Sequence, residues 1–428
     1  MRTPPFQKIL RRILSEQPPT FLDPSFYTSA ELLPLEQQHI FRKSWIYVGH
    51  ATKLAEPNSG MITEVAGHSL LLTRTEGGTL KAFYNVCPHR GALLETTEVA
   101  KPLKCLVCPY HGWVFDSSGQ LKATPEKTRF SQAINFEKFS LKPVRLETWG
   151  PLIFVCLSET APPLSAFLGE AYTRMSAFPL DQVVCLFEKD YTVRCNWKTF
   201  HDNSLCDYHV SIAHPKTLKD VQGLTKYYQY ALGDYVNVLE TPITRAWLKD
   251  HQVLDELPEP LRSQFLTFGI FPNLHVYALP NGHLFIERIE PMSVDTCQVH
   301  TEVYGIPGHD DTDSLAALEA WYDELFDEDL RLTEGVQRGY ASGAFSPGPI
   351  NELEARIIHQ QQLIRRFLLQ GLKSQIPPIA GGSHAAALEN AAGFEFLVRK
   401  YSQSQEQSQA LRETAKITQK HPKMPIRQ

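Results

Sequence analysis

Two short segments of the chain each carry one cysteine and one histidine close together. Residues 87–91 read Cys-Pro-His-Arg-Gly, and residues 108–112 read Cys-Pro-Tyr-His-Gly. Proline stiffens each loop, and glycine adopts the backbone angles that a tight turn requires. Two thiolates can bind one iron of a [2Fe–2S] cluster while two imidazoles bind the other, which raises the reduction potential. The pattern therefore predicts an electron-transfer cluster with four ligands: Cys87, His89, Cys108 and His111.

A structural zinc ion is the alternative for the same segment. Cys105 and Cys108 have the spacing of a zinc-binding pair, and Cys87 with one histidine would complete four ligands. We favour the cluster, because both loops begin with Cys-Pro and end with a His-Gly type of sequence, which a zinc site does not explain. Cys105 is then expected to be a buried strand residue.

A second group of possible metal ligands lies in residues 195–215, which contain His201, His209 and His214. On an ideal helix, His209 and His214 would point about 140° apart. Binding one ion therefore requires the helix to end or bulge between them, and Pro215 favours an ending. Two histidines and one carboxylate on one face of a metal are typical of non-haem Fe(II) oxygenases. We therefore expect a mononuclear metal whose carboxylate comes from elsewhere in the chain.

The carboxylate can be sought in the helix expected at residues 314–340. Apolar residues recur there at steps of three, four or seven, as in Leu318, Tyr322, Leu325, Leu332, Val336 and Tyr340. Asp329 completes this stripe, and a carboxylate on a buried face is costly unless it is paired or bound to metal. We predict that Asp329 is the third ligand; a buried pair with an arginine is the alternative. Asp327 and Glu328 fall off the stripe and are expected to be solvated.

The elements that must hold these residues divide the chain in two. Residues 45–157 show short strands and turns, which predicts an all-β unit, and Pro162-Pro163 lies in a linker. After it, strands and long helices predict an α+β domain with helices on one side of a sheet. The expected strands are 183–193, 265–277, 283–289 and 296–304. The expected helices are 35–44, 195–209, 314–340 and 352–372.

We therefore expect four parts along the chain. These are an N-terminal segment (1–44) that packs on the catalytic domain, the cluster domain (45–160), the catalytic domain (166–374) and a C-terminal extension (375–428). Apolar residues between Phe6 and Leu14 lie at helical spacing, and we expect a short helix on the protein body rather than a surface-binding one.

Composition excludes several classes of protein. The 428 residues carry a net charge of −5, so no nucleic-acid partner is expected. No apolar run approaches the roughly 20 residues of a membrane helix, and no secretory signal is evident, so we expect neither membrane binding nor secretion. The eight cysteines then favour metal binding over disulfides. The expected location is the cytoplasm.

The motifs resemble a known family. Residues 85–113 resemble the Rieske domain of ring-hydroxylating oxygenase α subunits, down to the Asn-Val before the first loop and the Tyr-His-Gly-Trp at the second. Residues 196–215 resemble the iron segment of these enzymes, and residues 326–339 resemble the segment that supplies their carboxylate. The resemblance, which covers about residues 36–370, implies a Rieske [2Fe–2S] cluster, a catalytic sheet of helix-grip type, and mononuclear Fe(II) on His209, His214 and Asp329.

The resemblance also implies an activity. The chain would be a terminal oxygenase that uses O₂ and electrons relayed from NAD(P)H through a separate reductase, with or without a ferredoxin. We expect it to hydroxylate a small organic substrate, with aromatic ring hydroxylation favoured. A monooxygenase or N-demethylase for a quaternary ammonium compound is the alternative, and a Rieske electron-transfer or redox-sensing protein without oxygenase activity is another. A head-to-tail homotrimer is implied, in which each cluster serves the iron of its neighbour.

One position departs from the family pattern. A carboxylate three residues before the first iron-binding histidine usually bridges it to a cluster histidine of the neighbouring subunit, and here that position is Cys206. The nearest acids are Asp207 and Asp202. On a helix, Asp202 shares a face with His209, while Asp207 would lie about 200° away. We favour Asp207 over Asp202 as the bridging acid, and both acids could instead be ordinary surface residues.

Overall fold

The structure is a computed structural model that describes residues 20–95, 101–103, 105–259, 261–309 and 314–375, together with Ile13. The expected N-terminal helix, apart from Ile13, and the C-terminal extension beyond residue 375 lie outside the described residues. Residues 19–364 form one compact unit. Among the described helices, none is both long and apolar enough to cross a membrane.

The first part of the chain forms two antiparallel sheets, as expected. In the described residues, the larger sheet has the strand order β1-β10-β9-β4-β3-β2-β5 and the smaller has the order β6-β7-β8. The larger sheet contains β1 (Ile46–His50), β2 (Ser59–Val65), β3 (His68–Arg74), β4 (Leu80–Tyr84), β5 (Lys101–Pro102), β9 (Pro143–Trp149) and β10 (Leu152–Cys156). The smaller sheet contains β6 (Leu106–Val107), β7 (Val114–Phe115) and β8 (Leu121–Ala123).

A tight turn joins β2 to β3. Ala66 and Gly67 both have positive φ angles, 50° and 74°. Two consecutive residues of this kind form the turn whose twist suits an antiparallel hairpin. The strands pair from Val65 opposite His68 to Ser59 opposite Arg74. Residues 59–74 therefore form a regular β-hairpin.

The second part of the chain forms an antiparallel sheet with the strand order β11-β17-β16-β15-β14-β13-β12 in the described residues. Its strands are β11 (Val184–Val193), β12 (Gln229–Leu232), β13 (Val236–Pro242), β14 (Gln264–Ile270), β15 (Leu274–Ala278), β16 (Leu284–Pro291) and β17 (Cys297–Gly305). The expected strand at 265–277 is a hairpin of β14 and β15, because Pro272 lacks the N–H that a continuous strand would use. The sequence analysis missed β12 and β13.

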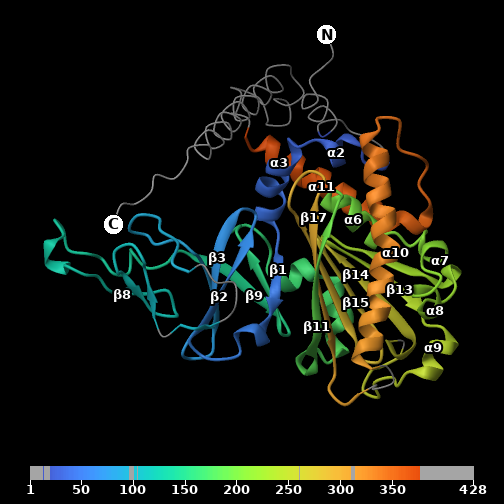
Figure 1. Cartoon of the computed structure of the whole chain (residues 1–428), viewed down its shortest axis with the longest axis horizontal. Helices are drawn as coiled ribbons and strands as arrows, with labels where there is room; N and C mark the ends of the chain where they lie inside the picture. The colour runs from blue at the N-terminus through green and yellow to red at the C-terminus, as the bar shows by residue number, and fades with distance from the viewer. Residues whose placement is uncertain are drawn as a thin grey trace, which may run out of the picture. The chain divides into compact units, whose positions relative to one another are not determined.

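Helix α10 runs across one face of this sheet (Figure 1). The two longest helices are α10 (Leu315–Ala341) and α11 (Ala355–Lys373). The others are α2 (Ser25–Thr28), α3 (Leu32–His39), α4 (Leu164–Leu168), α5 (Glu170–Arg174), α6 (Trp197–Ser204), α7 (Val210–Ala213), α8 (Leu218–Val221) and α9 (Arg245–Asp250). The α+β organisation expected for this part of the chain is confirmed.

The segment before β1 packs on these helices. A buried ion pair joins Glu36 of α3 to Lys198 of α6, with Nζ 2.5 Å from Oε1. The indole N–H of Trp197 donates to the other Glu36 oxygen at 2.8 Å. The hydroxyl of Tyr27 donates to Asp202 on α6. Residues 20–44 therefore contact the second part of the chain, although they precede the first.

Candidate metal centres

The two Cys-Pro loops have the same backbone hydrogen bonds. In each, the cysteine N–H donates to the carbonyl five residues later, and the glycine N–H donates back to the cysteine carbonyl. The bonds are Cys87 N to Ala92 O (2.8 Å), Gly91 N to Cys87 O (2.9 Å), Cys108 N to Trp113 O (2.8 Å) and Gly112 N to Cys108 O (3.0 Å). Gly91 and Gly112 have φ angles of 76° and 66°, which side chains disfavour. The loops are therefore two copies of one conformation.

The four predicted cluster ligands lie together at these loops. Cys87 and Cys108 are buried, and burial together with the Cys108 thiol raises the pKa of Cys87. The rings of His89 and His111 lie 4.6 Å apart between centroids. Their Nδ1 atoms are buried without a hydrogen-bond partner among the described residues. Paired thiols and paired orphan imidazole nitrogens are the donor set that a [2Fe–2S] cluster with two cysteines and two histidines needs.

Cys105 is placed differently from what we expected. It is exposed and lies just before β6, so the prediction of a buried strand residue was wrong. The ligands of a structural zinc ion are enclosed. An exposed Cys105 is therefore a poor partner for the buried Cys87 and Cys108, which weakens the zinc alternative.

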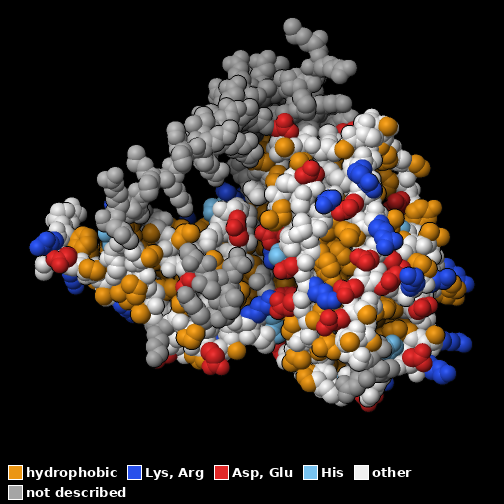
Figure 2. Space-filling view, in the orientation of Figure 1, with side chains coloured by type: hydrophobic (Ala, Val, Ile, Leu, Met, Phe, Trp, Pro, Cys, Tyr) orange, Lys and Arg blue, Asp and Glu red, His pale blue; other side chains and the backbone are white. Residues whose placement is uncertain are grey.

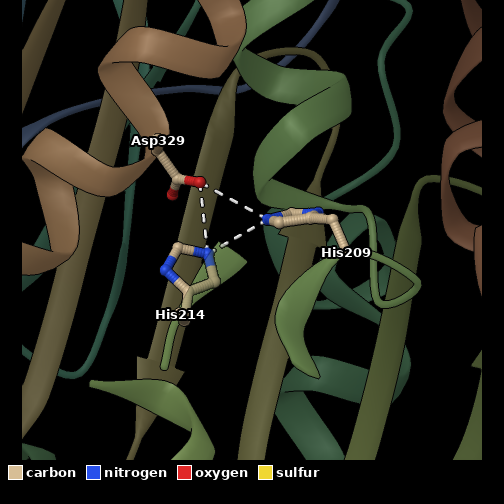
Figure 3. Close-up of side chains that lie close together, drawn as sticks. All are labelled: His209, His214 and Asp329. Carbon is tan, nitrogen blue, oxygen red and sulfur yellow. Dashed lines mark hydrogen bonds and ion pairs between the residues drawn. The ribbon is translucent and has the colours of Figure 1, made fainter. Parts of the chain in front are cut away.

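The second predicted site brings together two segments that are distant in sequence (Figure 3). His209 Nε2 lies 3.0 Å from His214 Nε2 and 3.4 Å from Asp329 Oδ1, and His214 Nε2 lies 3.2 Å from the same oxygen. Ligand atoms about 2.1 Å from one metal and at right angles to each other would be about 3.0 Å apart. The three atoms therefore match one triangular face of a metal's coordination shell.

An interruption of the helix makes this geometry possible. The expected helix at 195–209 ends earlier, since α6 stops at Ser204. A second helix, α7, runs only from Val210 to Ala213. His209 is its N-cap, and His214 follows it with φ −112° and ψ 57°, outside the helical region. Both imidazoles thus point to one place, which an unbroken helix would forbid.

The electrostatic interactions among these groups suit a bound cation. Burial lowers the pKa of His209, but hydrogen bonds to Asp329 and Cys206 outweigh it and raise that pKa to about 10. Burial raises the pKa of Asp329, but hydrogen bonds from His209 and His214 outweigh it and hold the pKa below its usual range. A bound metal ion would replace the protons that these three groups otherwise share.

Glu328 orients one of the histidines, which the sequence analysis missed. Its Oε2 lies 3.0 Å from His214 Nδ1 and accepts a hydrogen bond of 2.6 Å from Thr217. The Glu328 side chain is 11% exposed, so the prediction that it is solvated was wrong. An Nδ1–H that donates to Glu328 leaves the Nε2 lone pair facing Asp329, the arrangement found around metal-bound histidines. Asp327, by contrast, is exposed as expected.

The buried face of α10 changes beyond Asp329. Leu332 and Val336 are 40% and 43% exposed, whereas Thr333 and Gln337 are buried. Gln337 Oε1 accepts hydrogen bonds from the Asn196 N–H and the Thr199 hydroxyl. The predicted apolar stripe is therefore correct up to Asp329 and wrong at Leu332 and Val336, because the helix turns a polar layer toward α6.

Of the two candidate bridging acids, Asp207 is buried and Asp202 is partly buried. Asp207 Oδ1 lies 3.2 Å from Nη1 of Arg356, and burial raises the pKa of Asp207 to about 6 although Arg356 opposes this. Asp202 Oδ2 accepts hydrogen bonds from the Tyr27 hydroxyl (2.6 Å) and the Gln361 amide (2.8 Å). Burial raises the pKa of Asp202 to about 7. The alternative that these are surface acids was therefore wrong.

Cys206 occupies the place next to the first histidine. Its side chain interacts with His209 and helps to raise the pKa of that imidazole. His201 is also buried, and burial lowers its pKa to about 3, so its imidazole is neutral. His201 is not among the residues that surround the cavity at His209.

A cavity adjoins the three clustered groups. Its wall includes His209, His214 and Asp329, together with Glu287 and Arg356. Four aromatic side chains also line it: Phe200, Phe265, Tyr277 and Phe326. A substrate in this cavity would therefore lie beside the candidate metal, between aromatic rings and two charged groups.

Known proteins match both halves of the chain. Residues 44–143 match the Rieske [2Fe–2S] domain model, and residues 170–370 match the catalytic domain model of ring-hydroxylating α subunits. The carnitine monooxygenase oxygenase subunit of Acinetobacter pittii is 31% identical over 332 residues, which span 75% of this chain and 85% of that protein. The glycine betaine monooxygenase oxygenase subunit of Pseudomonas aeruginosa is 26% identical over 367 residues, spanning 76% and 84%.

Solved structures show the same fold. A quaternary ammonium Rieske monooxygenase superposes with a TM-score of 0.69 at 25% identity, covering 82% of this chain and 99% of that chain. Naphthalene 1,2-dioxygenase from a Rhodococcus species superposes with a TM-score of 0.70 at 17% identity, covering 86% and 99%. Because proteins with such different substrates share the fold, the substrate must be argued from the cavity.

Proposed function

The chain belongs to the ring-hydroxylating α-subunit family of Rieske oxygenases, and we propose that it hydroxylates a small quaternary ammonium compound at a mononuclear iron. Members of this family are terminal oxygenase components that work with a separate reductase. The observation that carries the proposal is the triangle of His209, His214 and Asp329 on the wall of an aromatic cavity.

Each metal centre is assigned to residues whose donor atoms fit it. Cys87, His89, Cys108 and His111 would hold the cluster, and His209, His214 and Asp329 would hold the iron. When bound, the cluster supplies single electrons and the iron activates O₂. Glu328 keeps the His214 Nε2 lone pair available. The described residues offer three ligands at this point, so coordination positions would stay open. Residues 45–160 would carry electron transfer and residues 166–374 catalysis.

The cavity supports a quaternary ammonium substrate more than an aromatic hydrocarbon. A flat hydrocarbon ring requires an apolar slot, whereas this cavity contains the charged groups Glu287 and Arg356. A quaternary ammonium is attracted to the faces of aromatic rings such as Phe265 and Tyr277, and to a carboxylate. The two relatives described above are named for carnitine and glycine betaine. We therefore rank this substrate class above aromatic ring hydroxylation, which the sequence had favoured.

The net reaction has a fixed balance. One C–H bond, one O₂, two electrons and two protons give one C–OH group and one water. If the oxidised carbon is an N-methyl group, the C–N bond of the resulting N⁺–CH₂OH unit breaks to give formaldehyde, a tertiary amine and one proton.

We also propose a head-to-tail homotrimer. Hydrophobic side chains gather over the small sheet of the Rieske domain, as Figure 2 shows. Val107 and Tyr110 beside the second loop are 50% and 53% exposed. Beside the other site, Tyr208 and Ile212 are 56% and 83% exposed. Exposed apolar residues at both sites are what supports contact between the cluster of one subunit and the iron site of another.

We also propose which acid lies beside the electron route from the cluster to the iron. Asp207 lines the cavity with His209, whereas Asp202 is held by Tyr27 and Gln361. We therefore retain Asp207 over Asp202 as the acid beside the route, with Cys206 in contact with His209.

For location we propose the cytoplasm. All eight cysteines lie in described residues and are free thiols, as in a reducing compartment.

The test is anaerobic reconstitution of the chain with iron, sulfide and a reductase. An oxygenase should hold about three irons per chain, and a pure electron carrier about two. O₂ uptake and product mass are then measured with quaternary ammonium and aromatic substrates. Uptake coupled to a product 16 mass units heavier, or to formaldehyde, supports the proposal. Two irons per chain with no coupled uptake would favour the electron-transfer alternative, and turnover of aromatic rings alone would refute the substrate class.

A further inference from the structure

The geometry points to Arg356 as the residue that binds a substrate carboxylate, so that the enzyme prefers zwitterions carrying both a quaternary ammonium and a carboxylate. This inference rests on the proposed function and narrows its substrate class. It requires one group that attracts the ammonium and one that binds the carboxylate in the same cavity. The cavity wall supplies Glu287 for the first role and Arg356 for the second.

Arg356 has an unused donor. Its side chain is 1% exposed. The Nε–H donates to Asn237 Oδ1 at 2.8 Å, and Nη1 donates to Asp207 Oδ1 at 3.2 Å. Nη2 is buried and has no hydrogen-bond partner among the described residues. A buried guanidinium N–H without a partner costs free energy, and an incoming carboxylate would remove that cost.

The guanidinium is held firmly before any substrate arrives. Arg356 stands in the first turn of α11, which follows the capping box of Asn351 and Glu354. Asn237 reaches it from β13, and Asp207 from the segment after α6. The backbone N–H of Asp207 also donates to Leu353 O at 3.1 Å. Three elements thus fix the donor, which lowers the entropy cost of binding an anion.

The group that would attract the quaternary ammonium, Glu287, lines the same cavity. Glu287 accepts hydrogen bonds from Tyr277 (2.8 Å) and Tyr322 (2.7 Å), and it faces His275 Nδ1 at 3.2 Å. Tyr277 itself lines the cavity and lies edge-on to Phe265, with ring centroids 5.9 Å apart. A carboxylate among aromatic rings attracts a quaternary ammonium, which has no N–H and needs no hydrogen bond.

The competing explanation is that Arg356 serves only to neutralise Asp207. That role uses Nη1 and leaves Nη2 unexplained. It also predicts no dependence on the substrate's carboxylate. A site built to hydrogen-bond a substrate group discriminates strongly against an analogue that lacks it, because the buried donor is then left unpaired. Substrate discrimination therefore separates the two explanations.

The experiment compares matched substrates on the reconstituted holoenzyme. Each ω-trimethylammonium carboxylate, with one to four carbons between the two groups, is paired with its primary amide. We expect kcat/KM for the best carboxylate to exceed that of its amide by about 100-fold. Calorimetric binding to the holoenzyme under nitrogen, without reductase, should show the same preference in Kd.

Variants then locate the discrimination. Arg356→Gln combined with Asp207→Asn removes the ion pair together, so that no buried charge is orphaned. The carboxylate-to-amide ratio should fall to within about threefold of one, while Arg356→Lys should keep part of it. Arg288→Gln is the matched control, since Arg288 pairs with Glu290 and does not line this cavity. Its ratio should not change. The cluster's visible spectrum verifies folding of each variant.

The outcomes distinguish this inference from the proposed function. Equal use of carboxylate and amide by the unaltered enzyme would overturn the role of Arg356. A carboxylate-to-amide ratio that survives in the double variant, or that stays undiminished in Arg356→Lys, would do the same. Each of these outcomes would still leave a quaternary ammonium oxygenase. Failure of every trimethylammonium compound to bind or react would overturn both.

Discussion

The two candidate metal centres are built in opposite ways. The cluster loops lie between residues 87 and 112, and backbone hydrogen bonds within each loop set their shape. The iron site joins His209 and His214, on either side of a four-residue helix, to Asp329 in the middle of α10. Its geometry also depends on a contact between these segments, since Glu328 of α10 orients His214. A local site can be recognised from a motif and should tolerate distant changes, whereas a site built from distant segments should not.

The largest effect is expected when the iron site is removed and the cluster is left in place. Asp329→Ala deletes the carboxylate that faces both histidines, so we expect mononuclear iron to be lost and kcat to fall by at least about 1,000-fold. The cluster should persist, with about two irons per chain and an unchanged visible spectrum. Iron analysis and absorption spectroscopy check this. Loss of the cluster in the same variant would show that the two sites do not form independently.

The next largest effect is expected at Glu328, which orients a ligand of the iron site. Glu328→Gln weakens the hydrogen bond that orients His214, and such changes typically lower metal affinity by about 10–100-fold. Iron retention against a chelator measures it. Asp327→Asn is the matched control, because its side chain is exposed on the same helix turn. Equal iron retention in both variants would mean that Glu328 does not orient the ligand.

A third effect concerns pH and buried charge. Burial raises the pKa of Asp202 to about 7, against about 3.9 for an unfolded chain. A raised carboxyl pKa stabilises the fold below pH 4, and this contribution is lost as the pH rises through 7. We expect the free energy of unfolding to fall by on the order of a few kcal/mol between pH 4 and 7. Asp202→Asn should reduce that slope.

Denaturant unfolding at several pH values measures this slope, with the exposed Asp181→Asn as control. An unchanged slope in Asp202→Asn would contradict the assignment. In the cluster domain, the pKa of Asp116 is lowered instead, because hydrogen bonds from Lys122 and Ser118 outweigh its burial. The fall in stability above pH 4 should therefore originate in the catalytic domain.

The smallest effect is expected at Cys105. Cys105→Ser should change the free energy of unfolding by less than about 0.5 kcal/mol, as for other exposed positions, and should leave the cluster spectrum intact. Cys108→Ser, three residues away, should abolish the spectrum. Metal loss in Cys105→Ser would revive the zinc alternative.

The same contrast explains what the sequence could reveal. The cluster loops were predictable because ligands, prolines and turn glycines are contiguous. Asp329 was predictable from helical phase alone, since a carboxylate on an apolar stripe is conspicuous. Glu328 was not, because its partners His214 and Thr217 lie on another segment. The ion pair between Asp207 and Arg356 could not be predicted for the same reason, because the two residues lie on segments that are distant in sequence.

One structural feature bears on how the protein is made. The strands that enter and leave the Rieske domain, β1 and β10, pair with each other from Ile46 opposite Val155 to His50 opposite Leu152. That domain can close on itself as soon as the ribosome has released β10. Residues 20–44 emerge before this domain, yet Glu36 pairs with Lys198, and Leu22 pairs with Gln361 in α11, so both must wait for residues that are made later. During synthesis, the Rieske domain would therefore be folded while the segments of the catalytic domain before and after it are still unfolded.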